Sequence, residues 1–190
     1  MTSPTATGEA TAEAPQPSYD IQGREVRLPV DVRDSTAAVA YYFVSASAAQ
    51  RLIDDPSLMP TAVEEMLRYV SPLMYFRRTA TSDTEIHGQA IKEGDKVTLW
   101  YGSANRDEDA FPNPDVFDVG RTPNTHVALG AGGPHFCLGA SLARLETQLM
   151  FEELLRRLPD IELNGPVSRL RSNFINGIKH MPVTFTPEKG

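Results

Sequence analysis

Alternation of apolar and polar residues predicts extended structure near the start of the chain. Within the stretch 24–34 the apolar positions follow a period of two, at Val26, Leu28, Val30 and Val32, which is typical of a half-buried strand. A second apolar run, 37–46, is predicted as another strand, and 45–53 as the start of a helix. The sequence Asp-Asp-Pro-Ser at 54–57 interrupts these patterns, so we place a domain boundary there.

A helical period begins after that boundary. Pro60 and Thr61 open a segment whose apolar residues lie at 63, 66, 67 and 70, the spacing of one helix face. Ser71 and Pro72 are expected to end this helix. A second long helix is predicted to end at Pro159. Its leucines are Leu138, Leu142, Leu145, Leu149, Leu154, Leu155 and Leu158.

The segments around these helices have strand and turn patterns. Short alternating runs between 76 and 101, separated by turn residues at Gly88 and 93–95, predict a small antiparallel sheet. Near the C-terminus, Asn176 and Gly177 stand between two apolar runs, which favours a β-hairpin. We therefore predict a mainly α fold with small antiparallel β-sheets, preceded by a short β-rich segment at 18–57.

Composition and charge exclude several classes of protein. The 190 residues include 18 Lys and Arg against 25 Asp and Glu, a net charge of −7, and one cysteine. Because an acidic chain lacks the basic surface of a nucleic-acid-binding protein, nucleic acid is not expected as a partner. A single cysteine forms no internal disulfide, so a reducing, cytoplasmic location is expected.

Targeting and membrane signals are weak throughout. The longest uncharged stretch, 35–50, is too short and too rich in Ser and Ala to span a bilayer, so we expect no membrane span. Residues 1–17 are rich in Ala, Thr, Pro and Glu and contain no basic residue. They are predicted to be a disordered tail and not a signal peptide.

Cys137 is the first candidate for chemistry. We expect it in the first turn of the second long helix, where backbone N–H groups and the helix dipole favour a thiolate, a nucleophile or metal ligand. The alternative is a buried free cysteine. Glycines surround it at 130, 132, 133 and 139, and without Cβ atoms they let the backbone lie flat against a large planar group. His135 would donate to an anionic part of that group, or it is an ordinary loop histidine.

Charged residues form a second candidate feature. Glu65 and Arg68 are one turn apart on the first long helix, where such residues form either a charge-assisted pair or a solvated surface pair. Further along come Arg77 and Arg78, then a Pro- and Phe-containing stretch that ends in Arg121, and then the glycine-rich cysteine loop.

Taken in this order, these features resemble the C-terminal third of a cytochrome P450, over about 58–189. The matching motifs are the E-x-x-R helix, the meander ending in Arg121, the haem-loop H-x-C-x-G at His135, Cys137 and Gly139, and the long helix after it. The resemblance implies a partial cytochrome P450 fold, with 58–190 as the haem-binding part. The sequence from Ser71 onward, SPLMYFRRTATSDTEIHG, resembles that of actinobacterial members that hydroxylate sterol side chains or methyl-branched lipids.

The resemblance also implies a role for each candidate residue. Cys137 would be the proximal thiolate ligand of the iron of haem b, in a loop that contains Gly130 and Gly139. His135 and Arg78 would contact the haem propionates, with Arg77 as the alternative if the register differs by one. The remaining expectations are a buried charge network of Glu65, Arg68 and Arg121 under the haem, and substrate contacts from Met74, Tyr75 and Ile175.

The implied activity is a haem-thiolate monooxygenase that hydroxylates an apolar small molecule with O2. Electrons would come from a ferredoxin or another electron-donor protein. In the haem loop, Leu129 lies eight positions before Cys137, whereas the family usually has Phe seven positions before the cysteine. Loss of that aromatic contact near the thiolate is expected to alter the potential of the iron.

Two alternatives to an active monooxygenase follow from the residues. No segment between Met1 and Pro60 matches the oxygen-activating helix of the family, so the chain would be a truncated, catalytically silent fusion fragment or gene remnant that binds haem poorly or not at all. Such an incomplete fold is expected to expose a large apolar face. The less favoured alternative is a thiol enzyme with Cys137 as nucleophile and His135 as base.

The front segment has a different resemblance. Residues 18–53 resemble the opening strands of acetoacetate-decarboxylase-like proteins, a family that works through a Schiff-base lysine. No lysine occurs before Lys92, so the segment carries no residue for that chemistry. We therefore predict a segment of different origin at 18–57, joined to the cytochrome P450-like part.

Overall fold

The structure is a computed structural model that describes residues 18–21, 24–27 and 46–187. The chain divides into two units, 1–36 and 37–190. Within the first unit, β1 (Ser18–Ile21) pairs antiparallel with β2 (Arg24–Arg27). The predicted tail at 1–17 and the predicted strand at 37–46 lie wholly or almost wholly outside the described residues. The strand predicted at 24–34 is described only as far as residue 27.

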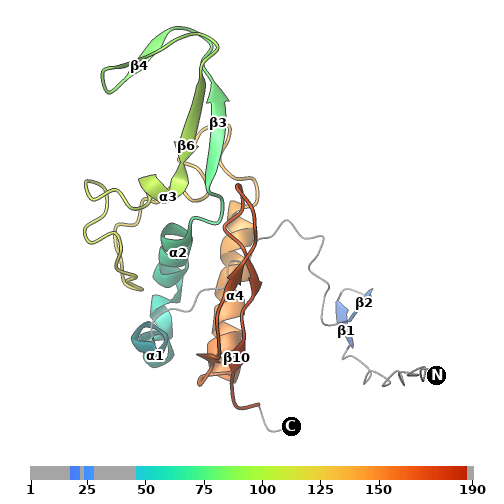
Figure 1. Cartoon of the computed structure of the whole chain (residues 1–190). Helices are drawn as coiled ribbons and strands as arrows, with labels where there is room; N and C mark the ends of the chain where they lie inside the picture. The colour runs from blue at the N-terminus through green and yellow to red at the C-terminus, as the bar shows by residue number, and fades with distance from the viewer. Residues whose placement is uncertain (1–17, 22–23, 28–45, 188–190) are drawn as a thin grey trace, which may run out of the picture. The chain divides into compact units, whose positions relative to one another are not determined.

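Helices form the core of the second unit. They are α1 (Ala46–Asp54), the short η2 (Pro56–Leu58), α2 (Met59–Val70), α3 (Tyr101–Ala104) and α4 (Ala140–Arg157). Helices α2 and α4 lie side by side, with α1 against their lower ends (Figure 1). One buried cluster joins α1 and α2 with α4 and the segment between α3 and α4, and its members are Ala48, Leu52, Met59, Ala62, Val63, Met66, Leu67, Val119, Ala128, Phe151 and Leu155.

The packing of α1 bears on the domain boundary. Ala48 and Leu52 of α1 belong to the same core cluster as α2 and α4. By packing, α1 is therefore part of the second unit, whereas the sequence pattern placed the boundary after it at 54–57. The different origin of 18–57 stays a prediction.

Helix α2 follows the predicted pattern closely. Its apolar residues at 63, 66, 67 and 70 are all buried. At its N-terminal side, the Asp55 carboxylate accepts the Ser57 backbone N–H at 3.1 Å and so caps η2. At its end, Ser71 adopts a left-handed conformation with φ of 46°, and its N–H donates to the Leu67 carbonyl. The predicted end of the helix at Ser71 is confirmed.

Helix α4 starts later than predicted. It begins at Ala140 with Gly139 as the N-cap residue, so the prediction that Cys137 lies in its first turn is wrong. The Ala140 N–H donates to the Cys137 carbonyl at 3.1 Å, which closes a separate turn before the helix. The apolar face of α4 is divided: Phe151 and Leu155 are buried, but Leu142, Leu145 and Leu149 are more than half exposed.

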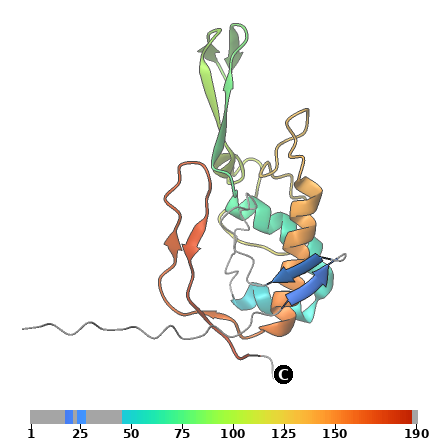
Figure 2. The same cartoon turned by 90° about the vertical axis from the view of Figure 1, so that its right-hand side faces the viewer.

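Small antiparallel strand pairs complete the second unit, as predicted for 76–101. Strand β3 (Tyr75–Thr79) pairs with β6 (Lys96–Trp100), and β4 (Thr84–Ile86) pairs with β5 (Gln89–Ile91). These four strands extend away from the ends of the helices (Figure 2). Gly88 and Gly94 have φ of 79° and 87°, left-handed conformations that glycine adopts without strain.

The C-terminal strands form two antiparallel pairs. Strand β7 (Glu162–Leu163) pairs with β10 (Val183–Thr184), and β8 (Ser168–Arg169) pairs with β9 (Ile178–His180). Strands β8 and β9 form a β-hairpin whose loop contains Asn176 and Gly177, as predicted, but this loop spans 170–177 and is longer than a tight turn at the pair, and Ile175 within it forms a bridge with Leu73. Asn176 is held at the end of α2: its N–H donates to the Pro72 carbonyl and its side-chain amide donates to the Val70 carbonyl.

Candidate functional site

A buried ion pair on α2 lies at the centre of the site. Arg68 donates to both carboxylate oxygens of Glu65, at 2.7 and 2.8 Å, and neither side chain is exposed. Arg121 of the meander donates to the same carboxylate at 3.0 Å from its Nε. The backbone N–H of Asp118 and the side-chain amide of Asn124 also donate to Glu65. The carboxylate is therefore saturated with donors, which is what a buried charge requires.

The two arginines of this network also hold the backbone of the meander. Arg68 donates to three carbonyls, those of Asn105, Pro114 and Val116. Arg121 likewise donates to three, those of Pro112, Asn113 and Val116. The structure thus brings together Glu65, Arg68 and Arg121, the three residues predicted to form a charge network. Because desolvation offsets most of the Coulomb attraction in such a network, its main contribution is position.

The cysteine loop lies between the meander and α4. Gly130 has φ of 91°, and a Cβ on it would come within 3.4 Å of backbone atoms of His135 and Phe136. Cys137 is fixed through its backbone: its N–H donates to the Leu129 carbonyl at 2.9 Å, and its carbonyl accepts the Ala140 N–H. The thiol is free and exposed, so the alternative of a buried structural cysteine is wrong.

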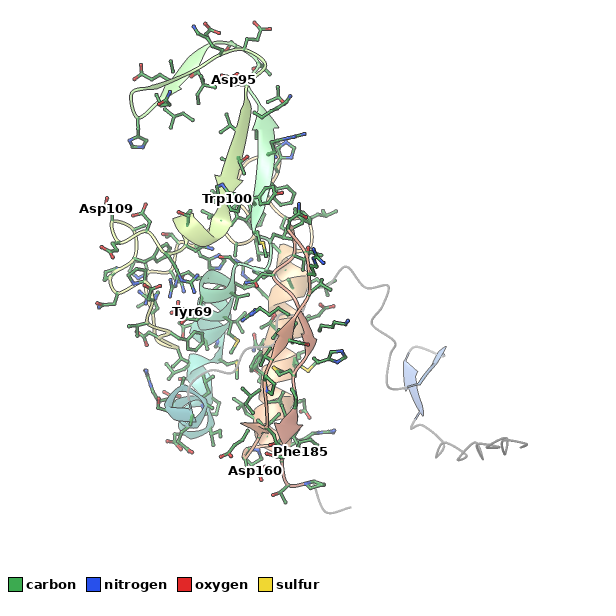
Figure 3. The ribbon with its side chains drawn as sticks, viewed as in Figure 1. Tyr69, Asp95, Trp100, Asp109, Asp160 and Phe185 are labelled. Atoms are coloured by element: carbon green, nitrogen blue, oxygen red, sulfur yellow. The ribbon has the colours of Figure 1, made fainter. Side chains whose placement is uncertain are left out.

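A cavity of about 820 Å³ lies beside this loop. It is lined by residues of β3, β6, α3 and the loop, among them Arg78, Trp100, Gly130 and His135. Figure 3 shows Trp100 at the end of β6 that is nearest α3. The structure therefore brings Arg78 and His135 to one cavity, and Arg77 does not line it. Cys137 and Gly139 are also absent from its lining.

The predicted substrate residues meet where two chain segments cross. Leu73 and Ile175 form the bridge between them, and the Met74 N–H donates to the Phe174 carbonyl at 2.9 Å. Tyr75 packs against Trp100 with ring centroids 4.8 Å apart. Met74, Tyr75 and Ile175 are therefore neighbours, but none of the three lines the cavity.

A second polar network was missed by the sequence analysis. Glu64, the neighbour of Glu65, accepts two hydrogen bonds from Arg144 of α4, at 2.6 and 2.9 Å. Its Oε2 also lies 3.1 Å from His126 Nε2. Partial burial disfavours the charged carboxylate, but the hydrogen bonds and charges of His126 and Arg144 outweigh it and lower the pKa of Glu64 to about 2. The doubled acid in E-E-x-x-R was the available signal, although it does not identify the partners.

Asn105 is a further residue that the sequence analysis missed. It is fully buried, and its side-chain amide donates to Ser71 Oγ at 2.8 Å. Its Oδ1 accepts the Val127 N–H at 2.8 Å. Asn105 thereby connects the end of α2 to residues 126–129, the strap that leads into the cysteine loop.

Other kinds of site find no support in the described residues. Among residues 46–187 and the two short strands before them, no cluster of three His, Cys, Asp or Glu side chains is arranged to hold a metal ion. No helix in the described part of the chain has the length and apolar character needed to cross a membrane.

Comparisons with known proteins agree with these features. The family described as cytochrome P450 matches residues 47–168. The methyl-branched lipid omega-hydroxylase of Mycobacterium tuberculosis is 53% identical over 133 residues, 70% of this chain and 31% of the relative. The steroid C26-monooxygenase of Mycolicibacterium smegmatis is 51% identical over 138 residues, 72% of this chain and 34% of the relative.

A solved structure gives the same result. A cytochrome P450 of Mycobacterium marinum in complex with pseudoionone matches with a TM-score of 0.70 and 48% identity, over 73% of this chain and 34% of the other. This chain spans about a third of the length of these relatives. The partial fold of helices and small antiparallel sheets is confirmed, while the resemblance of 18–53 to acetoacetate-decarboxylase-like proteins stays a prediction. By its sequence, its fold and the E-x-x-R and cysteine-loop geometry, the chain belongs to the cytochrome P450 family.

Proposed function

We propose that this chain is the haem-binding part of a monooxygenase, with Cys137 as the axial ligand of the iron of haem b. The observation that carries the proposal is the free, exposed thiol of Cys137 at the end of a glycine-rich loop. Its backbone is hydrogen-bonded on both sides, to Leu129 and to Ala140. A thiolate is one of the ligands that haem iron takes in proteins.

The other residues of the site fit the same cofactor. Arg78 and His135 line one cavity beside the loop, and cationic donors there suit the propionate carboxylates of haem. Gly130 and Gly139 add no side-chain atoms to the loop, and Gly130 has a left-handed backbone conformation that favours glycine. The Glu65–Arg68–Arg121 network fixes the meander and needs no contact with the cofactor to do so.

Haem, when bound, supplies the redox-active iron that reacts with O2. The chain's own residues would then bind and orient: the Cys137 thiolate would bind the iron, and Arg78 and His135 would hold the propionates. An apolar substrate would contact Met74, Tyr75 and Ile175. Because two relatives are named for methyl-branched lipid and steroid oxidation, we propose a lipid or steroid substrate. Electrons would come from a ferredoxin-like donor protein. A thiol that must stay reduced to bind iron favours the cytoplasm.

A second candidate is that this polypeptide, taken alone, binds haem poorly and is catalytically silent. All residues of 131–139 are exposed, and the leucines of α4 that face away from the core are more than half exposed. Both surfaces are suited to cover by further polypeptide. The thiol-enzyme alternative has no matching observation, since no hydrogen bond found among the described residues joins His135 to Cys137.

Haem reconstitution tests the proposal. The chain is mixed with haem, reduced and exposed to CO, and the Soret band is recorded. A strongly red-shifted band, lost in Cys137→Ala but kept in the neighbouring control Ser141→Ala, supports thiolate ligation. The same measurement is made after co-expression with the N-terminal two thirds of a steroid C26-monooxygenase. A thiolate spectrum only in that mixture supports the silent-fragment reading, and a histidine-type spectrum or no haem in both overturns the haem-thiolate assignment.

A further inference from the structure

We infer that Glu64 is a positioning residue that holds the cysteine loop in place by binding both of its flanks. One flank is the strap 126–129 that enters the loop, and the other is the start of α4 that leaves it. The consequence for iron ligation rests on the proposed function, but the positioning itself is a property of the chain.

The connection through α4 uses Arg144. Its guanidinium binds the Glu64 carboxylate through two hydrogen bonds, at 2.6 and 2.9 Å, a bidentate geometry that fixes orientation as well as distance. The first turn of α4 then leads back to the loop. The Ala143 N–H donates to the Gly139 carbonyl, and the Ala140 N–H donates to the Cys137 carbonyl. Glu64 is in this way connected to the carbonyl side of the cysteine.

The connection through the strap uses His126, whose side chain is 2% exposed. The Ala128 N–H donates to His126 Nδ1 at 3.2 Å, so in the neutral ring the proton is on Nε2 and donates to Glu64. The next carbonyl along, that of Leu129, accepts the Cys137 N–H. Glu64 is therefore connected to the amide side of the cysteine as well.

These two connections matter because the loop has little other support. Residues 131–139 are exposed throughout, so burial contributes little to their position, and the flanks determine where the thiol lies. One carboxylate on α2 binds a side chain from each flank, His126 of the strap and Arg144 of α4. The low pKa of Glu64 keeps this carboxylate ionised at neutral pH, and the groups that face it are His126 and Arg144.

Hydrogen exchange on the 190-residue chain, measured without haem, tests the inference. In Glu64→Ala we expect peptides covering 127–140 to exchange about tenfold faster or more, since two charge-assisted connections are lost. Glu64→Gln should show a smaller increase, because its amide oxygen still accepts one hydrogen bond. Peptides covering β4 and β5 should not change. The matched control is Glu153→Gln, an exposed carboxylate of α4 that pairs with Arg156 and Arg157.

Two outcomes would overturn the inference. Unchanged exchange at 127–140 in both Glu64 variants would overturn it. Equal acceleration in the loop and in the core of α2 would also overturn it, because Glu64 would then act on global stability. Arg144→Gln separates the two flanks: it should loosen the start of α4 more than the strap 126–129. Failure of haem binding both by the unmodified chain alone and in the mixture with the N-terminal fragment would remove the proposed function and leave these results standing.

Discussion

Glu65 and Arg68 are joined by two parallel hydrogen bonds of 2.7 and 2.8 Å, and both side chains are completely buried on α2. A pair so placed gains little net stability from its own attraction, because both charges are removed from water. The pair still has consequences at long range. Through the same guanidinium, Arg68 holds carbonyls that are 37 to 48 residues away in the chain.

Removal of one partner should therefore be severe. In Glu65→Ala the charges of Arg68 and Arg121 lose their common partner, and we expect the free energy of unfolding to fall by about 3 to 5 kcal/mol. Urea denaturation followed by circular dichroism measures the change. Glu153→Ala, in which the lost carboxylate is on the surface of α4, should leave the transition midpoint unchanged. Similar midpoints in the two variants would contradict a structural role for the buried pair.

The sequence predicted α2 well because its signals are local. The apolar spacing at 63, 66, 67 and 70 and the helix end at Ser71 are properties of one short segment, and the structure has both. The hairpin predicted around Asn176 and Gly177 is present between β8 and β9, but its loop is longer than a tight turn, because Asn176 bonds to Pro72 and Val70, about a hundred residues earlier. A local turn signal contains no information about such a partner.

The same distinction applies to the site. The motif predicted that Glu65, Arg68 and Arg121 belong together, and the geometry agrees. It did not predict Glu64 with Arg144, or Asn105 with Val127, because these pairs depend on how α2, α3 and α4 pack. The periodicity of α4 also did not indicate which leucines are covered, because burial depends on neighbouring elements and not on helix spacing.

Asn105 gives a second stability test. In Asn105→Ala, the Val127 N–H loses the Oδ1 atom that accepts it and Ser71 Oγ loses a donor. A buried polar group left without a partner costs about 1 to 3 kcal/mol, so we expect a loss of that size in urea denaturation. Asn173→Ala is the control, because that side chain is exposed and its hydrogen bond to Tyr75 is long at 3.5 Å. An equal effect in both variants would argue against the buried connection.

Acid should weaken the contacts of Glu64. The pKa of this carboxylate is about 2, below its ordinary value of 4.5, so the unfolded chain binds more protons between these values. Its stabilising contribution is complete above pH 4.5 and is lost as the pH falls towards 2. As the pH falls from 4.5 to 2, the free energy of unfolding of Glu64→Gln should therefore decrease less than that of the unmodified chain.

The measurement is urea denaturation at a series of pH values in high salt. Salt screens the contributions of exposed carboxylates such as Glu153, whose pKa is also lowered, mainly by its hydrogen bond to Arg156. Glu153→Gln should therefore follow the unmodified chain under these conditions. If the free energy of unfolding falls as steeply with decreasing pH in Glu64→Gln as in the unmodified chain, the network of Glu64 with His126 and Arg144 is not formed in solution.

The exposed leucines of α4 give the last prediction. Leu142, Leu145 and Leu149 are 58%, 53% and 52% exposed, and they recur at helical spacing along one face. A contiguous apolar surface of this kind binds apolar dyes and promotes self-association. The triple variant with glutamine at these three positions should bind less dye and sediment as a smaller species. Its free energy of unfolding should change little, because exposed side chains contribute little to the core.

Phe151→Ala is the contrasting control: it removes a side chain that is 5% exposed and should cost about 3 to 5 kcal/mol without reducing dye binding. If the glutamine variant loses as much free energy of unfolding as Phe151→Ala, the three leucines are buried in solution. In that case α4 has no exposed apolar face for further polypeptide to cover.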